Sequence, residues 1–133
     1  MRKRKIILAL FILVLATTVY LAFFRGQEPS RAGRLLTMAA EEASSIESLE
    51  DRITRQLNIA EMQIRLNEKK EAIKTLHLAA ATLKAQEKGP VTLDDFRRIA
   101  GWTSVAQLSH RAGADPFATD ACYTALEALH SVQ

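Results

Sequence analysis

The chain has 133 residues, a formal net charge of +3 and an isoelectric point near 9.2. Four of its 18 Lys and Arg residues lie at positions 2–5, so the rest of the chain holds 14 of them against 15 Asp and Glu. A nucleic-acid-binding surface needs clustered surplus positive charge, and the composition therefore argues against nucleic acid as a partner. The one cysteine, Cys122, excludes an internal disulfide.

The first element in chain order is an uncharged apolar run, Ile6–Phe24. As a helix it would reach roughly 28 Å, close to the hydrocarbon thickness of a bilayer, so the run predicts a single transmembrane helix. A cleavable signal peptide has a shorter apolar core followed by a small-x-small cleavage site. Tyr20 occupies the position where that site needs a small residue, which favours an uncleaved signal anchor.

The basic residues at positions 1–5 predict that the N-terminus is cytoplasmic. The rest of the chain would then lie in the periplasm, or on another extracytoplasmic side, of a single-pass membrane protein, with a bacterial inner membrane as the expected location. Residues 25–30 include Gly26 and Pro29 and are expected to form a linker.

The remaining residues, 31–133, are predicted to form an all-α domain, because apolar residues recur at spacings of three and four. About 109 residues follow the apolar run, enough for one small domain with a thin core. The expected helices have capping signals, with Ser44 and Thr92 as N-caps and Asp115 as an N-cap before Pro116. Their expected ranges are 30–44, 45–66, 68–86, 92–112 and 115–131, and the alternative is that the first two form one helix.

The chain repeats itself at a spacing of 46 residues, since segment 52–87 aligns on segment 98–133. The break between helices falls at Asn67 in one copy and at Gly113 in the other, and both residue types tolerate the left-handed conformation that ends a helix. Residues 36–40 resemble residues 76–80, which indicates a partial leading repeat.

These two copies resemble a tetratricopeptide-type helix-turn-helix repeat. The resemblance rests on a small residue where the paired helices touch, the turn residue just described, and another alanine early in the second helix. The alanines are Ala60 and Ala72 in the first copy, and Ala106 and Ala118 in the second. The repeat of 40–46 residues is longer than the 34 of that family. The resemblance implies an array of about two and a half repeats that binds proteins and is not an enzyme.

No catalytic, cofactor-binding or metal-binding residue is predicted. His77, His110 and His130 lie on different expected helices and lack the spacing of metal ligands. The adjacent carboxylates at 41–42 and 94–95 would point in different directions on a helix, which argues against a catalytic pair.

The candidate partner contacts are Asn58, Arg65, Trp102 and Arg111. Trp102 lies on the stripe of Ile99 and Val105, so a position in the core is the favoured alternative for it. Arg65 and Arg111 occupy equivalent positions near helix ends, where a cation complements the helix dipole, and this alternative is also favoured.

The predicted function is a membrane-anchored scaffold that binds a partner protein through its repeats. Protein partners and the membrane are the expected contacts, and a homo-oligomer is possible. The alternative is a structural subunit of a larger membrane assembly, whose span packs against other spans through small residues such as Ala9 and Ala16.

Overall fold

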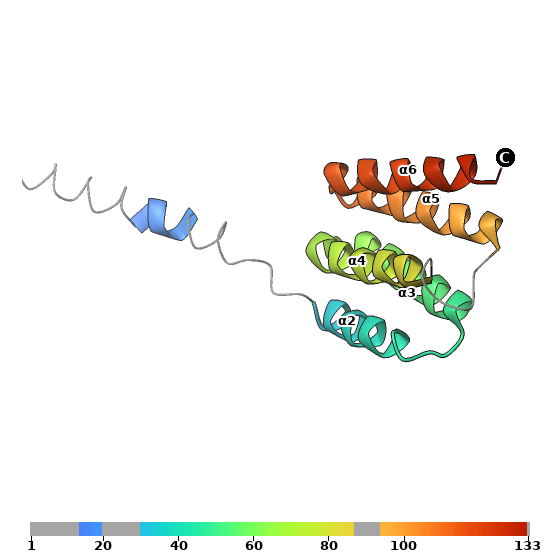
Figure 1. Cartoon of the computed structure of the whole chain (residues 1–133). Helices are drawn as coiled ribbons and strands as arrows, with labels where there is room; N and C mark the ends of the chain where they lie inside the picture. The colour runs from blue at the N-terminus through green and yellow to red at the C-terminus, as the bar shows by residue number, and fades with distance from the viewer. Residues whose placement is uncertain (1–13, 20–29, 87–93, 133) are drawn as a thin grey trace, which may run out of the picture.

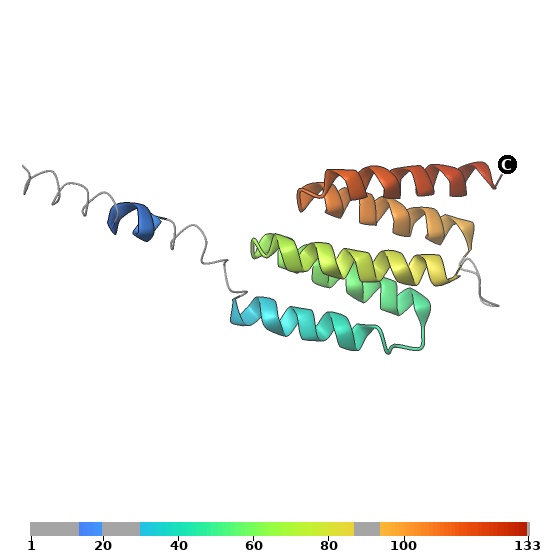
Figure 2. The same cartoon turned by 60° about the vertical axis from the view of Figure 1, so that its left-hand side comes forward.

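The computed structural model describes residues 14–19, 30–86 and 94–132. They contain helices and turns and no strand, so the all-α part of the prediction is confirmed for them. Figures 1 and 2 show the long helices stacked in chain order, with α2 at one end and the pair α5–α6 at the other. These helices are α2 (Arg31–Ala43), α3 (Leu49–Arg65), α4 (Lys69–Gln86), α5 (Asp95–Arg111) and α6 (Asp115–His130).

The predicted transmembrane helix Ile6–Phe24 is not supported. Within the described ranges, no helix has both the length and the apolar character needed to cross a membrane. Only residues 14–19 of the predicted span are described, and these six helical residues reach about a third of the hydrocarbon thickness. The other residues of the span, including both ends, lie outside the described residues, as do the whole basic start (1–5) and linker residues 25–29. The single-pass location and the orientation rested on this helix, and they are corrected with it.

Side chains cap the first turns of three helices, although not always the predicted ones. The Ser30 hydroxyl accepts a hydrogen bond from the backbone N–H of Gly33 at the start of α2, and the Asp94 carboxylate caps α5 in the same way. Helix α3 begins after Ser48 rather than at the predicted Ser44. Helices α2 and α3 are therefore separate, with a turn between them. The guanidinium of Arg52 donates to the carbonyl of Ile46 and stabilises this turn.

Helix α6 begins at Asp115 itself, so this residue is the first of the helix and not the predicted cap. Ala114 occupies the cap position and makes no side-chain hydrogen bond there, while Pro116 lies within the first turn, where its missing N–H costs nothing. The predicted cap at Thr92 falls outside the described residues. Helix starts were therefore predicted to within a few residues, but the capping side chains were not.

The two tight turns of the array are built alike. Asn67 has φ 61° and Gly113 has φ 82°, and each follows the last turn of a helix. After each of them, the next backbone N–H bonds back to a carbonyl five residues earlier, from Glu68 to Gln63 and from Ala114 to Ser109, at 2.8 Å in both turns. This is the Schellman arrangement that left-handed residues make possible. The break predicted at a spacing of 46 residues is confirmed in both copies.

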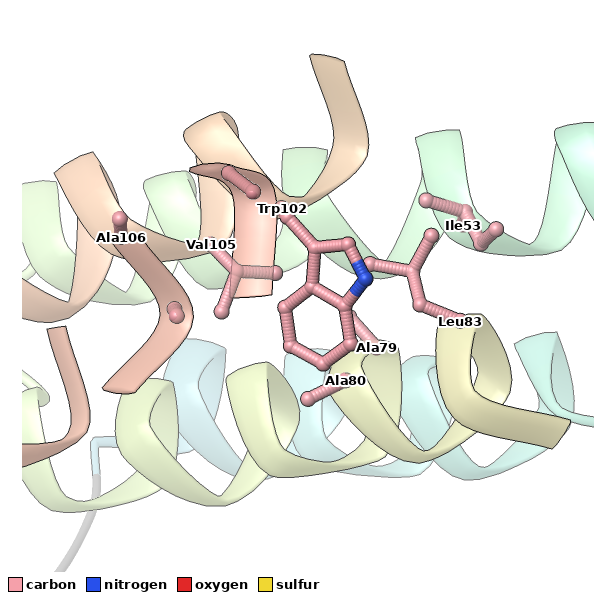
Figure 3. Packing of buried hydrophobic residues seen from close by; sticks show 9 residues of the cluster. Ile53, Ala79, Ala80, Leu83, Trp102, Val105 and Ala106 are labelled. Atoms are coloured by element: carbon pink, nitrogen blue, oxygen red, sulfur yellow. The ribbon is translucent and has the colours of Figure 1, made fainter. Parts of the chain in front are cut away.

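The second hairpin, α5–α6, packs on the first, α3–α4, through a close approach of α5 to α4. A Cβ on Gly101 would lie 2.8 Å from Cδ2 of Leu83, so glycine permits this contact. Trp102 is 1% exposed and extends from α5 toward Ala79, Ala80 and Leu83 of α4 (Figure 3). This apolar cluster joins the two hairpins.

The leading helix α2 is joined to α3 and α4 by buried polar side chains rather than by large apolar ones. The Gln63 amide donates to the hydroxyl of Thr37 on α2 (3.3 Å) and accepts from the hydroxyl of Thr75 on α4 (2.8 Å). Seven residues away on each helix, a second layer of the same kind joins Ser44, Gln56 and Thr82. Both glutamines are fully buried, so these layers specify the register of the three helices.

Candidate functional site

Three of the four predicted partner contacts lie at or near a shallow groove between α3 and α5, called here the inner groove. Two adjoining hollows of about 210 and 360 Å³ form it, and both are lined by Thr54, Leu57 and Ser104. Asn58 and Arg111 line the larger hollow. Arg65 is exposed beside it on α3.

The structure brings Arg65 and Arg111 together on one carboxylate. Oε1 of Glu61 lies 2.9 Å from Nη2 of Arg65 and 3.6 Å from Nη1 of Arg111. The Arg65 guanidinium, by its hydrogen bond and its charge, holds the pKa of Glu61 below its ordinary value, and the charge of Arg111 adds to this. At the other end of the groove, Arg97 pairs with Glu50. These cations are therefore already paired within the protein.

The fourth predicted contact, Trp102, lies in the apolar cluster between α4 and α5 and offers no surface to a partner in this conformation. Trp102 is therefore a core residue, the alternative that its place on the stripe of Ile99 and Val105 favoured. The four alanines of the repeat, Ala60, Ala72, Ala106 and Ala118, are all buried.

A larger and more apolar surface lies on the outer side of the last hairpin and is called here the terminal face. It forms an open hollow of about 940 Å³ between α5 and α6, floored by Ala106, Ala118 and Ala125. The side chains around this floor are Thr103, Gln107 and His110 from α5, and Cys122, Tyr123 and Leu126 from α6. Leu129 extends the face, since it lies one helical turn beyond Leu126.

The terminal face corresponds to a surface that is covered in the first hairpin. At the spacing of 46 residues, Leu83 of α4 corresponds to Leu129 of α6, and their exposed fractions are 1% and 48%. Leu76 is fully buried, whereas its equivalent Cys122 is exposed. Helix α5 and the Phe117 side chain cover the first surface, with the ring of Phe117 stacked on His77 at 4.0 Å. Nothing covers the second surface among the residues described.

The charged groups of the terminal face are few. Nδ1 of His110 lies 2.7 Å from Oδ1 of Asp115 where α5 turns into α6. Among residues 14–19, 30–86 and 94–132, no group of three His, Cys, Asp or Glu side chains lies close enough to hold a metal ion. Exposed apolar patches with a polar border are typical of sites that contact proteins, membranes or ligands.

The predicted partner contacts did not include Cys122, Tyr123, Leu126 or Leu129. A signal for them was present, because α6 has these side chains beside the buried stripe of Ala121, Ala125 and Ala128. A helix that is apolar on more than one face needs more than one covering element. Among the described residues, no further repeat supplies that cover for the outer side of α5–α6.

Comparison of this chain with protein-family models, with curated proteins and with solved structures found no match. The tetratricopeptide-type resemblance therefore rests on the residues of the repeat alone, and it stays a prediction.

Proposed function

We propose that this protein is an interaction module that binds an amphipathic helix of a partner protein on its terminal face. The proposal rests on the difference in side-chain exposure between equivalent positions of the two hairpins. Leu83 and Leu76 are buried under α5, whereas Leu129 and Cys122 occupy the same places in the second hairpin and are exposed. A surface built to be covered by a helix is uncovered in the second hairpin among the described residues.

The shape of the terminal face favours a helix over an extended peptide. Its equivalent surface accommodates α5, a helix of 17 residues, so the spacing of its apolar positions already matches a helical ligand. The inner groove is a weaker candidate because its hollows are smaller and its arginines are paired with Glu50 and Glu61. Contacts of a partner with Asn58, Arg65 or Arg111 stay predictions.

Helix α5 supplies a probe for the test. A fluorescent peptide with the sequence of Asp95–Arg111 is titrated with the full-length protein, and binding is followed by fluorescence anisotropy. We expect saturable binding that weakens by about 10-fold or more in the double variant Leu126→Gln, Leu129→Gln. Two leucines lose their buried apolar contacts in that variant, each worth about 1 kcal/mol when half of the side chain is buried.

The matched control is the double variant Leu35→Gln, Met38→Gln on α2. These side chains are 59% and 60% exposed, similar to the pair on α6, but they lie at the opposite end of the array. Their replacement is expected to leave the affinity unchanged. An absence of saturable binding, or equal losses in the two double variants, would contradict the proposal.

A further inference from the structure

The outer surface of the first hairpin receives one large side chain of α5, that of Trp102. Its ring extends toward Ala79, Ala80 and Leu83 of α4 (Figure 3). Ile53 of α3 belongs to the same buried apolar cluster. These four residues of α3 and α4 are called here the tryptophan site. A large apolar side chain buried in this way is the type of contact that anchors a helix on a protein surface.

The second hairpin repeats the tryptophan site with one change. The equivalent residues are Ile99 of α5 and Ala125, Leu126 and Leu129 of α6, called here the second site. Three of them keep the residue type of the first hairpin, whereas Leu126 replaces Ala80. The side chains of Leu126 and Leu129 are 51% and 48% exposed, so the second site is open among the described residues. Leucine in place of alanine takes up part of the volume that an anchor would fill.

The approach of α5 to the first hairpin also depends on the residue before the tryptophan. A Cβ on Gly101 would lie 2.8 Å from Cδ2 of Leu83, so a larger side chain there would clash with α4. Seven residues later in α5, Leu108 belongs to the same apolar cluster as Leu76. Later positions of α5 thus contact earlier positions of α4, and the two helices are antiparallel.

On the premise of the proposed function, we infer that the helix bound on the terminal face has a leucine-sized anchor directly after a glycine or alanine. The anchor occupies the second site and is smaller than tryptophan, because Leu126 already fills part of that volume and volume-conserving exchanges are tolerated best. The small residue lets the helix approach Leu129. The helix is antiparallel to α6, so its residue seven positions after the small one covers Cys122.

A second copy of this chain does not offer such a pair among the described residues. A docking helix needs the glycine or alanine and the anchor on an exposed face. In the described ranges, every glycine or alanine that directly precedes a large apolar residue is itself buried; these residues are Ala72, Gly101, Ala125 and Ala128. We therefore assign the pair to the partner of the proposed function.

The test compares two fluorescent peptides on the full-length protein and on its variant Leu126→Ala. One peptide has the sequence of α5, and the other is the same peptide with Trp102→Leu. We expect the leucine peptide to bind the wild-type protein more tightly. Leu126→Ala recreates the tryptophan site in the second hairpin, so it should shift the ratio of the two dissociation constants by about 10-fold in favour of the tryptophan peptide. A comparison of ratios cancels any difference in helicity between the peptides.

The matched control is Tyr123→Ala, which removes a larger side chain from the same helix outside the second site. This variant should keep the wild-type ratio. If the wild-type protein binds neither peptide, the proposed function fails. If both peptides bind but the wild-type protein prefers tryptophan, or Leu126→Ala leaves the ratio unchanged, the face binds helices and the inferred anchor is wrong. A shift of the same size in Tyr123→Ala would also overturn the inference.

A third peptide tests the small residue. Gly101→Leu, added to the leucine peptide, should weaken binding by about 10-fold, because the new side chain meets Leu129. Leucine favours a helix more than glycine does, so a higher helicity of the peptide would act in the opposite direction. Unchanged or tighter binding would show that the position before the anchor is not a close contact, and would overturn that part of the inference.

The direction of the helix is tested through Cys122, the one cysteine of the chain. A short bis-maleimide should link this thiol to a peptide with Leu108→Cys, because that position covers Cys122 in the inferred arrangement. The matched peptide has Arg98→Cys, near its other end, and should be linked much more slowly. Faster linking of the Arg98→Cys peptide would mean that the helix lies in the reverse direction, against the inference.

Sedimentation of the protein alone tests a second copy as the occupant. We expect a monomer at micromolar concentration. A reversible dimer that Leu126→Gln, Leu129→Gln abolishes would assign the terminal face to a second copy and overturn the inference.

Discussion

The two hairpins of this array have the same backbone plan but different surroundings. Both turn through a left-handed residue, at Asn67 and Gly113, and both bury alanine where their helices meet. The outer surface of α3–α4 is covered by α5, whereas the same surface of α5–α6 is open. The left-handed turn and the buried alanines are therefore enough to form a hairpin, whether or not another helix covers its outer surface.

The junctions on the two sides of α3–α4 differ as well. On the side of α3 that faces α2, the buried residues Gln56 and Gln63 make hydrogen bonds with Ser44 and Thr37. At the equivalent positions, α5 has Trp102 and Ser109, and the tryptophan lies in an apolar cluster against α4. Hydrogen bonds specify the first junction and apolar packing stabilises the second.

The largest expected effect comes from truncating equivalent leucines. Leu83→Ala should lower the free energy of unfolding by about 2–5 kcal/mol, because it removes a buried side chain and leaves a cavity. Leu129→Ala should cost less than about 1 kcal/mol, because the side chain is half exposed. Urea denaturation followed by the fluorescence of Trp102, the one tryptophan, measures both. Similar losses would remove the distinction between a covered and an open surface.

A smaller effect is expected at the polar junction. Gln63→Ala should lower stability by about 1–3 kcal/mol, because Thr37 and Thr75 lose their common partner inside the fold. A double-mutant cycle of Gln63→Ala with Thr75→Ala isolates the shared hydrogen bond, and its coupling energy should be about 1 kcal/mol. Additive losses would mean that the layer does not act as a unit.

The turns provide a third comparison. Gly113→Ala should cost about 1 kcal/mol or slightly more, because alanine is strained at φ 82° although a Cβ there would meet no atom within 4 Å. Asn67→Gly should change stability by only a few tenths of a kcal/mol, since asparagine already tolerates this region. Thermal unfolding measured by circular dichroism compares the two variants, and equal shifts would contradict the strain assigned to alanine in the left-handed region.

The smallest effect concerns Glu61. Its pKa is lowered in the folded protein by Arg65 and then Arg111, from an ordinary value of 4.5. The stabilisation is therefore present above that ordinary value and is lost as the pH falls through the folded pKa. Glu61→Gln should remove this part of the pH dependence below about pH 4.5 and leave the rest unchanged. The free energy of unfolding of both proteins is measured from about pH 3 to about pH 7, and its slopes against pH are compared.

The sequence predicted the helices between residues 30 and 131 and the turn positions because both depend on local patterns. The helix breaks at Asn67 and Gly113 needed only the conformational preferences of these residues. The cap at Ser48 was missed because Ser44, the better local candidate, is engaged by the Gln56 side chain from another helix. Hydropathy alone suggested the span at residues 6–24, and no helix of the described residues supports it.

The candidate site was harder to predict because it depends on which faces remain open. Arg65 and Arg111 were singled out as equivalent cations, but their meeting on Glu61 depends on the packing of α5 beside α3. Tyr123 and Leu126 would pass for core residues in a helical pattern. Their exposure reflects the lack of a covering helix on α5–α6 among the described residues, which a local pattern does not contain.

The most direct measurement is the rate at which a small alkylating reagent modifies Cys122 in the full-length protein. This thiol is exposed on the terminal face and is the one cysteine of the chain, so it reports on that face alone. The account predicts rapid modification of the free protein and progressive protection as the peptide with the sequence of α5 saturates it. Unchanged reactivity at saturating peptide would place the helix elsewhere and contradict the proposal that the terminal face binds it.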